Sequence, residues 1–216
     1  MNKKMIVLTS ILIMSSIFML GVFIVNKKTA EQAIQSANQD SAYLERSYSV
    51  TLGSPEAKVT LVEFFDPACE ACRAFYTFVK QLMNEHPGQI KLVMRYAPFH
   101  EGADYYVRIL EASRQQDKYW ETLEILYQSQ HYWASHHQAK PDLAWEVLKN
   151  TSLNINQLKE DMKDSQLDMI LSQDRADVAS LKISKTPSFY VNQKPLVQFG
   201  YQQLKDLVET EIAAMY

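Results

Sequence analysis

Glycine and cysteine are scarce in this sequence: of 216 residues, five are glycine and two are cysteine. So few glycines exclude collagen-like and glycine-linker architectures. An exported protein whose fold relied on disulfide bonds would ordinarily carry more than one cysteine pair. Basic charge is not in excess either, because the formal net charge is −3, which gives no electrostatic reason to expect nucleic acid as a partner. The 47% of hydrophobic residues and 22% of charged residues instead suit one medium folded domain with a real core.

The longest run without charge lies near the N-terminus, at residues 5–25. As a helix, such a run would be about 31 Å long, which matches the hydrocarbon core of a bilayer at ~30 Å. Lys3 and Lys4 precede it, and no following position has the paired small residues of a signal peptidase site. We therefore predict an N-terminal transmembrane helix, a membrane anchor or uncleaved signal, at residues 1–25, with a cleaved signal peptide as the alternative. Residues 26–46 are polar and are interpreted as a spacer.

The remainder of the chain combines strand-like and helical patterns. Residues 47–53 alternate as in a short edge strand, and residues 59–65 and 90–96 are apolar runs of strand length. Between these two runs, residues 69–85 have apolar side chains at helical spacing. A strand, a helix and a strand in this order predict a parallel β-α-β unit.

Several helical patterns then follow, over about residues 102–182. They precede a predicted hairpin of residues 188–191 and 196–199 and a last helix at residues 202–214. The predicted fold class is therefore α/β, a β-α-β unit followed by a β-β-α unit, with an inserted helical subdomain at about residues 102–182. The folded domain is expected to span residues 47–216.

Both cysteines belong to one motif, Cys69-Glu70-Ala71-Cys72, which directly follows the strand at 59–65 and opens a helix. Free N–H groups and the helix dipole stabilise negative charge at a helix N-terminus, so Cys69 is expected to favour the thiolate. The thiolate is the species that attacks a disulfide. Two intervening residues place the second sulfur where it can close a disulfide or resolve a mixed one. We predict that Cys69 attacks and Cys72 resolves.

Two other interpretations of the cysteine pair compete with this one. A static disulfide would close a very short loop, and the stabilisation from loop entropy grows with loop length. A zinc site would join Cys69 and Cys72 to His131 and His136, but the two halves are far apart in sequence and the histidines resemble an ordinary polar loop between helices. We expect no metal site.

The segment VTLVEFFDPACEACRAF at residues 59–75 resembles the active-site segment of DsbA-like thiol-disulfide oxidoreductases of the thioredoxin superfamily. The resemblance extends from about residue 47 to the end of the chain. Residues 97–100 are similar to the family's proline-histidine turn. The resemblance implies a thioredoxin-like fold and a redox-active Cys69–Cys72 disulfide that needs no other cofactor. His100 itself is interpreted as a structural hydrogen-bonding residue.

Thr186-Pro187 resembles the threonine and cis-proline loop that faces the active site in this superfamily. On the sequence alone, a cis bond and an ordinary trans turn are equally compatible with Pro187, and the resemblance favours cis. The Thr186 backbone is then expected to pair with an extended substrate segment and hold it over Cys69.

Glu63 lies within the apolar strand, where an ionised carboxylate is costly. Burial would raise its pKa and make it a proton acceptor or donor for Cys72 during exchange. The resemblance agrees, because superfamily members carry a buried acid at the equivalent position. A carboxylate that pairs with a lysine or reaches solvent at the sheet edge is the alternative.

The direction of exchange depends on the residues between the cysteines. The strongest oxidants of the family carry Pro-His there, whereas this chain carries Glu70-Ala71. Because the imidazole is missing and Glu70 adds a like charge, we predict a milder redox potential. Disulfide formation is the expected activity, and reduction or isomerisation is the alternative. A tethered binding module without redox turnover is an alternative of a different class.

The expected partners follow from these predictions. They are exported proteins with cysteines as substrates, a membrane or periplasmic redox partner that recycles the active site, and the membrane through the N-terminal helix. No nucleic acid partner is expected, and we expect a monomer. The catalytic domain is predicted to lie on the outer face of the cytoplasmic membrane, in the cell envelope.

Overall fold

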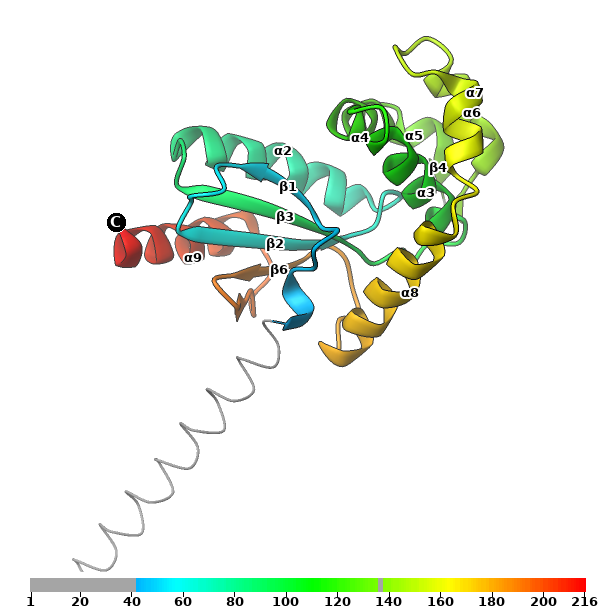
Figure 1. Ribbon diagram of the computed structural model, residues 1–216. Coiled ribbons are helices and arrows are strands. Elements are labelled where there is room, and N and C mark those ends of the chain that lie inside the picture. The colour runs from blue at the N-terminus through cyan, green and yellow to red at the C-terminus, as the bar shows by residue number, and fades with distance from the viewer. Residues whose placement is uncertain (1–41, 136–137) are drawn as a thin grey trace, which may run out of the picture. The chain divides into compact units, whose positions relative to one another are not determined.

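A five-stranded sheet forms the centre of the computed structural model, which describes residues 42–135 and 138–216 (Figure 1). Strands β2 (Val59–Phe65) and β3 (Ile90–Tyr96) are parallel and are joined through helix α2 (Glu70–Glu85), which confirms the predicted β-α-β unit. The predicted short edge strand is also present and pairs antiparallel with β3. In spatial order, the strands are β1 (Val50–Gly53), β3 (Ile90–Tyr96), β2 (Val59–Phe65), β6 (Ser188–Val191) and β7 (Lys194–Pro195).

The side chains of β2 alternate between the two faces of the sheet, as the pleat of a strand requires. Leu61 and Phe65 join the larger core together with buried residues of α2 (Glu70–Glu85) and α9 (Tyr201–Met215). Val62 and Phe64 point the other way and pack in a smaller core that includes a buried valine of α8 (Ser165–Ser180). Both faces of β2 are therefore covered, which explains its continuous apolar sequence.

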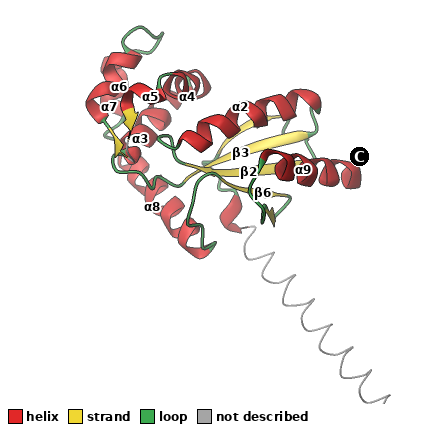
Figure 2. Ribbon diagram, turned by 180° about the vertical axis from the view of Figure 1, so that it is seen from behind, coloured by secondary structure: helices red, strands yellow, loops and turns green. Residues whose placement is uncertain are grey.

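A helical subdomain is inserted between β3 and β6, as predicted (Figure 2). Buried apolar residues of its helices extend the larger core away from the sheet. The inserted elements are α3 (Ala103–Arg114), α4 (Tyr119–Gln128), α5 (Gln130–Trp133), the short strands β4 (Ala134–Ser135) and β5 (Gln138–Ala139), α6 (Pro141–Leu148), α7 (Ile155–Asp161) and α8.

The predicted polar loop around His131 is wrong in its described part. Gln130 and Trp133 are buried within α5, and the Trp133 ring stacks on Tyr106 with ring centroids 3.7 Å apart. The Trp133 indole also donates a hydrogen bond to the Leu126 carbonyl at 2.9 Å. The buried Trp133 side chain thus anchors the segment in the core, which composition alone did not indicate.

The second strand of the C-terminal hairpin was also placed wrongly. The structure has it at Lys194–Pro195 and leaves Val197 85% exposed. The cause is the tight turn: Asn192 and Gln193 both have positive φ, at 45° and 72°. Two consecutive residues with positive φ form a two-residue hairpin turn. The second strand therefore begins directly after the turn, and Val191 lies opposite Lys194.

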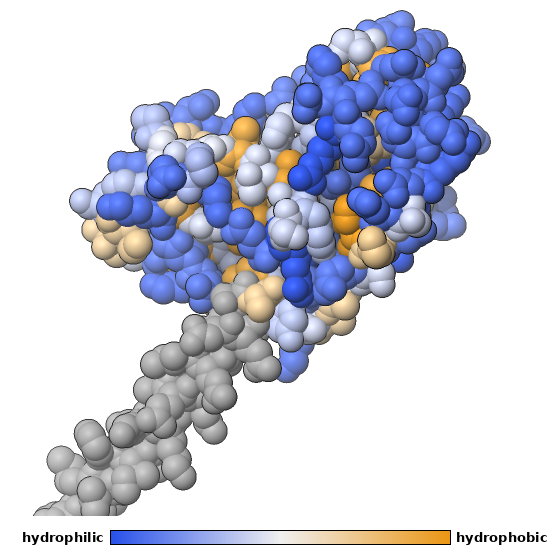
Figure 3. All heavy atoms as spheres, in the orientation of Figure 1, coloured by the Kyte–Doolittle hydropathy of each residue, from blue (hydrophilic) through white to orange (hydrophobic). Residues whose placement is uncertain are grey.

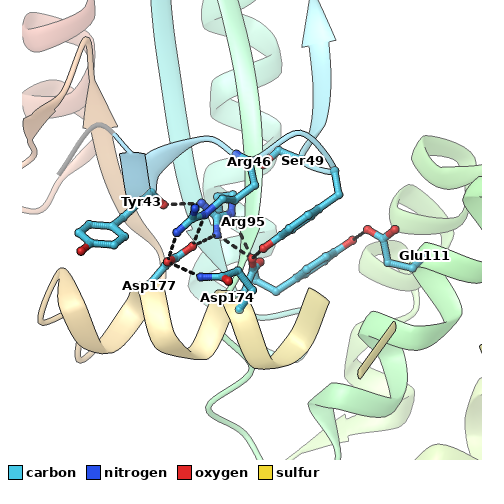
Figure 4. A network of polar contacts seen from close by, with 10 residues as sticks. Tyr43, Arg46, Ser49, Arg95, Glu111, Asp174 and Asp177 are labelled. Atoms are coloured by element: carbon cyan, nitrogen blue, oxygen red, sulfur yellow. Dashed lines mark hydrogen bonds and ion pairs between the residues drawn. The ribbon is translucent and has the colours of Figure 1, made fainter. Parts of the chain in front are cut away.

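A buried ion-pair network ties α8 and the start of the described chain to β3 (Figure 4). The Arg95 guanidinium lies 2.7 Å from Asp174 and 2.6 Å from Asp177, and all three side chains are at most 1% exposed. Arg46 binds the other oxygen of Asp177 at 2.6 Å. The Tyr48 hydroxyl donates to Asp174 at 2.6 Å. Each buried charge of this network therefore has partners within it.

Polar side chains cover most of the visible surface of the helical subdomain, and apolar patches appear beside it (Figure 3). Within the described residues, no helix has the length and apolar character needed to cross a bilayer. The predicted anchor at residues 1–25, and the spacer at 26–46 up to residue 41, lie outside the described residues.

Candidate active site

The turn between β2 and α2 places Cys69 at the N-cap of the helix. The Cys69 N–H donates to the Asp66 carbonyl at 3.0 Å, and Pro67 occupies the second position of this turn, where its fixed φ is favoured. The Asp66 carboxylate also accepts the Ala68 N–H at 2.7 Å. Cys69 keeps an extended backbone, with φ −79° and ψ 120°, and α2 begins at the next residue. Its sulfur thus lies beside the free N–H groups of the first helical turn.

These neighbours stabilise the Cys69 thiolate. The largest contribution is a hydrogen bond from the Cys72 thiol, and further hydrogen bonds come from the Thr186 side chain and from the N–H groups of Cys72 and Ala71. Together they outweigh burial and lower the pKa of Cys69 to about 6, from an ordinary value of 9.0. The helix N-terminus was expected from the sequence, but the contribution of the second cysteine as a hydrogen-bond donor was not.

Cys72 is the opposite of Cys69 in accessibility and acidity. Its side chain is 0% exposed, against 7% for Cys69. Burial is the main reason that its pKa is well above the ordinary value, and its hydrogen bond to Cys69 and the charge of Glu63 raise it further. Both cysteines are free, so this is the reduced state. The Cys69 sulfur is acidic and slightly exposed, and the Cys72 sulfur is fully buried and protonated.

Glu63 lies in the middle of β2 and is 0% exposed. Neither carboxyl oxygen has a hydrogen-bond partner in the described part of the chain. Burial, with a smaller contribution from the charge of Cys69, raises the pKa of Glu63 to about 8. The predicted burial and the predicted direction of the pKa shift are both confirmed, and the alternative of a lysine-paired or solvent-exposed carboxylate is wrong.

The Thr186-Pro187 loop lies against the Cys69 sulfur. The peptide bond between the two residues is cis, as predicted. The Cys69 sulfur is 3.3 Å from the Thr186 carbonyl oxygen. The chain therefore brings together residues that are 117 positions apart in sequence.

Asp66 holds the active-site turn against the connection that follows β3. Its fully buried carboxylate accepts hydrogen bonds from the Phe99 N–H at 2.7 Å, from the His100 N–H at 2.8 Å and from the His100 ring at 2.8 Å. The structural role expected for His100 is confirmed. Asp66 was not singled out in the sequence, although its place between a buried strand and a Pro turn was a usable signal.

Gln130 is a second residue that the sequence did not indicate. Its side-chain amide, 1% exposed, donates to the Pro67 carbonyl at 2.8 Å and to the Cys69 carbonyl at 3.0 Å. The helical subdomain thus contacts the active-site turn directly. A pocket of about 300 Å³ opens beside Cys69, and its other lining residues are Ala68, Glu70, His100, Ala134, Ser135 and Gln138.

The metal interpretation gains no support from the described residues. Nowhere in them are three His, Cys, Asp or Glu side chains grouped closely enough to hold a metal ion. His131 is exposed on α5, and His136 lies outside the described residues. What the arrangement offers chemically is a dithiol with one accessible thiolate and a buried acid behind it.

An asymmetric dithiol at a helix N-terminus, facing a cis-proline loop, defines a thiol-disulfide exchange protein of thioredoxin-like fold. A sequence profile of the family described as Thioredoxin matches residues 45–210. The chain therefore belongs to this family, and it is a DsbA-like thiol-disulfide oxidoreductase.

Known relatives agree with this assignment. A probable disulfide bond formation protein D of Bacillus cereus is 27% identical over 208 residues, which cover 91% of this chain and 94% of that protein. A thioredoxin-like oxidoreductase from Silicibacter pomeroyi is 31% identical, with a TM-score of 0.67 over 79% of this chain and 95% of the other. The alpha-DsbA1 structure of Wolbachia pipientis shares the fold, with a TM-score of 0.69 at 15% identity over 81% of this chain and 96% of the other.

Proposed function

We propose that the protein introduces disulfide bonds into exported proteins, with Cys69 as the exchanging sulfur and Cys72 as the resolving one. The observation that carries this proposal is the contrast between the two thiols. Cys69 has a pKa lowered to about 6 and lines an open pocket, whereas Cys72 is fully buried with its pKa raised. A substrate meets Cys69 first, and Cys72 is held behind it.

The reaction starts from the oxidised Cys69–Cys72 disulfide. A substrate thiolate attacks the Cys69 sulfur, the bond between the two cysteines breaks, and Cys72 leaves as a thiolate. Glu63, protonated at neutral pH because its pKa is about 8, gives this thiolate a proton. A second substrate thiolate then attacks the substrate sulfur of the mixed disulfide, forms the substrate disulfide and releases Cys69 as a thiolate. Two electrons pass from the substrate to the enzyme.

The Thr186-Pro187 loop is assigned to substrate binding. The Thr186 carbonyl lies 3.3 Å from the Cys69 sulfur, so a peptide that pairs with this backbone segment would carry its own cysteine to Cys69. The same residue also tunes the thiol, because a hydrogen bond from its side chain contributes to the low pKa of Cys69.

The direction of net reaction rests on the relatives and on the thiolate. The Bacillus cereus relative is named as a disulfide formation protein, and a stabilised thiolate favours the reduced enzyme and hence oxidation of the substrate. Glu70 and Ala71 are proposed to keep the potential milder than that of family members with a histidine between the cysteines. Reduction or isomerisation is the second candidate, and equilibration with glutathione decides between them. A potential near that of thioredoxin, about −270 mV, would identify a reductase.

The location is proposed from the sequence. Residues 1–25 would anchor the protein in the cytoplasmic membrane, residues 26–46 would act as a spacer, and residues 47–216 would be the catalytic domain on the extracytoplasmic side. There a redox partner would reoxidise the cysteines of the monomeric enzyme. A domain on that side encounters the unfolded exported chains whose thiols it oxidises.

Substitution of each cysteine tests the assignment. Cys72→Ser is expected to accumulate mixed disulfides between Cys69 and substrate proteins, seen by non-reducing electrophoresis and mass spectrometry, because the resolving thiol is gone. Cys69→Ser is the matched control and is expected to trap nothing and to lose oxidation of reduced, unfolded ribonuclease. A protein that still bound its partners equally well after Cys69→Ser would be a binding module, and this proposal would be wrong.

A further inference from the structure

Gln130 is a buried polar residue with an uneven set of hydrogen bonds. Its side-chain NH2 group donates to the Pro67 carbonyl at 2.8 Å and to the Cys69 carbonyl at 3.0 Å. Its side-chain oxygen, by contrast, is buried and has no hydrogen-bond partner within the described residues. A flipped amide would place this oxygen against the two carbonyl oxygens, so the turn dictates the orientation of the amide. Because buried unpaired acceptors are rare, the two contacts of the NH2 group are the reason for an amide at this position.

The two carbonyls belong to the turn that carries the Cys69 sulfur. The Cys69 carbonyl also accepts the Arg73 N–H at 3.2 Å, which is the first hydrogen bond of α2. The Cys69 backbone is extended, with ψ 120°, and this angle sets how its carbonyl is turned relative to its side chain. A hydrogen bond that fixes the carbonyl therefore also fixes the direction of the side chain relative to the start of the helix.

The direction of the Cys69 side chain decides how well its thiolate is stabilised. The Cys72 thiol contributes most to the low pKa of Cys69, and the N–H groups of Ala71 and Cys72 contribute as well. A further hydrogen bond comes from the Thr186 side chain. Hydrogen bonds weaken steeply when their geometry departs from the optimum, so a turn that rotates would lose part of this stabilisation.

The segment that presents Gln130 is itself firmly held. The hydroxyl of the preceding Ser129 donates to the Ile125 carbonyl at 2.7 Å. Three residues after Gln130, the indole of the fully buried Trp133 donates to the Leu126 carbonyl at 2.9 Å. The amide therefore reaches the turn from a packed part of the helical subdomain. A group that is held in this way fixes its partner more precisely than one on a loose loop.

We propose that Gln130 is a positioning residue for the exchange reaction, which fixes the two carbonyls of the turn and thereby keeps the Cys69 sulfur aimed at the N–H groups of the helix start. The inference rests on the proposed role of Cys69 as the exchanging sulfur and deepens it. Gln130 acts through the backbone of the turn and not on the substrate. The inserted subdomain thus helps to set the reactivity of a cysteine that belongs to the thioredoxin-like part of the fold.

The test compares the ionisation of Cys69 in the full chain with and without this amide. Gln130→Met keeps nearly the same length and volume and removes both donated hydrogen bonds. The midpoint of iodoacetamide alkylation across pH 4–9 is expected near 6 in the wild type. It is expected about one pH unit higher in Gln130→Met, the equivalent of one lost hydrogen bond to the thiolate. At pH 7, such a shift should move the equilibrium with glutathione toward the oxidised enzyme by roughly fivefold.

Tyr106→Phe is the matched control. It removes another side-chain donor to a backbone carbonyl of the helical subdomain, the 2.7 Å hydrogen bond to Lys140, and is expected to leave both measurements unchanged. Thermal unfolding shows whether each variant is folded. If Gln130→Met is not, Gln130→Asn takes its place, with the same expected direction because its amide is one methylene shorter.

Two results would overturn the inference. One is an unchanged alkylation midpoint in a folded Gln130 variant, and the other is an equal shift in Tyr106→Phe, which would indicate a general loosening of the subdomain. A wild-type midpoint near that of an ordinary thiol would instead overturn the proposed function itself, because Cys69 would then not be a stabilised thiolate.

Discussion

Two sets of buried carboxylates lie on or against neighbouring strands of this sheet and behave in opposite ways. Asp177 of α8 packs against Arg95 of β3, and although burial opposes its charge, hydrogen bonds from Arg46 and Arg95 lower its pKa. Glu63 of β2 has no such partner, and burial raises its pKa to about 8. Burial alone therefore does not decide the charge of a carboxyl group. Asp177 keeps its charge because guanidinium groups lie within hydrogen-bonding distance of it.

The difference corresponds to two roles. The Arg95 network joins the chain start, β3 and α8, and its side chains satisfy one another (Figure 4). Within it, the pKa of Asp177 is lowered by its hydrogen bonds to Arg46 and Arg95, and the pKa values of both arginines are raised, so these three groups keep their charges near neutral pH. Glu63 titrates near the pH at which exchange takes place, which suits an acid that gives a proton to Cys72 and takes it back. The paired acids therefore stabilise the fold, and the unpaired acid is the one that we propose serves the exchange chemistry.

Breaking the paired cluster is expected to have the largest effect. Arg95→Met leaves Asp174 and Asp177 buried with one fewer cation, and removal of one partner from a buried ion pair costs about 3–5 kcal/mol of the free energy of unfolding. Urea denaturation at pH 7 measures this loss. Cys69 is expected to keep its low pKa in the folded variant, because none of its hydrogen bonds comes from this cluster. A variant as stable as the wild type would show that the cluster does not hold the fold together.

Replacing Glu63 by a neutral residue is expected to raise the free energy of unfolding, whereas breaking the Arg95 cluster lowers it. The pKa of Glu63 rises from 4.5 when unfolded to about 8 when folded, so the folded protein binds more protons between these values and loses stability as pH rises through the window. Glu63→Gln removes this loss. The free energy of unfolding of Glu63→Gln should therefore rise relative to that of the wild type as pH increases, by roughly 1.4 kcal/mol per pH unit in the middle of the window. Denaturation at pH 5, 6.5 and 8 measures the slope, and a pH-independent difference would contradict the raised pKa.

The smallest effect is expected at Glu70, an exposed carboxylate within the motif. Solvent screens exposed charges, so Glu70→Gln should lower the pKa of Cys69 only slightly and make the redox potential slightly more oxidising. Iodoacetamide alkylation across pH 4–9 reports the midpoint, expected near 6 in the wild type. A large shift in the variant would show that an exposed acid controls the thiolate as strongly as the buried contacts do.

Parts of the fold followed directly from sequence patterns. The runs at residues 59–65, 90–96 and 188–191 are the strands as observed, because strands covered on both faces carry continuous apolar sequences. The end of the hairpin did not follow, because positive φ at Asn192 and Gln193 is a backbone feature that neither residue type enforces. Trp133 was misplaced because the polar residues around it conceal its contact with Tyr106.

The candidate active site likewise contains residues that the sequence indicated and residues that it did not. Cys69, Cys72 and Glu63 were identified from local sequence, since a helix start and an acid inside an apolar strand are both visible in a short window. Asp66 and Gln130 were not, because their importance comes from contacts with segments that are distant in sequence. The expectation about Thr186 and Pro187 needed the resemblance to a known family.

The sequence by itself determined the local chemistry of this protein: a cysteine pair at the start of a helix and a carboxyl group in an apolar strand. Only the tertiary structure decided which buried acids are paired, because Arg95 and Asp177 are 82 residues apart and meet only when α8 packs on β3. It also decided that Cys72 donates to Cys69 within a closed interior, where low polarity strengthens each such contact. Residue types fix what a group is able to do, and the surroundings fix its charge.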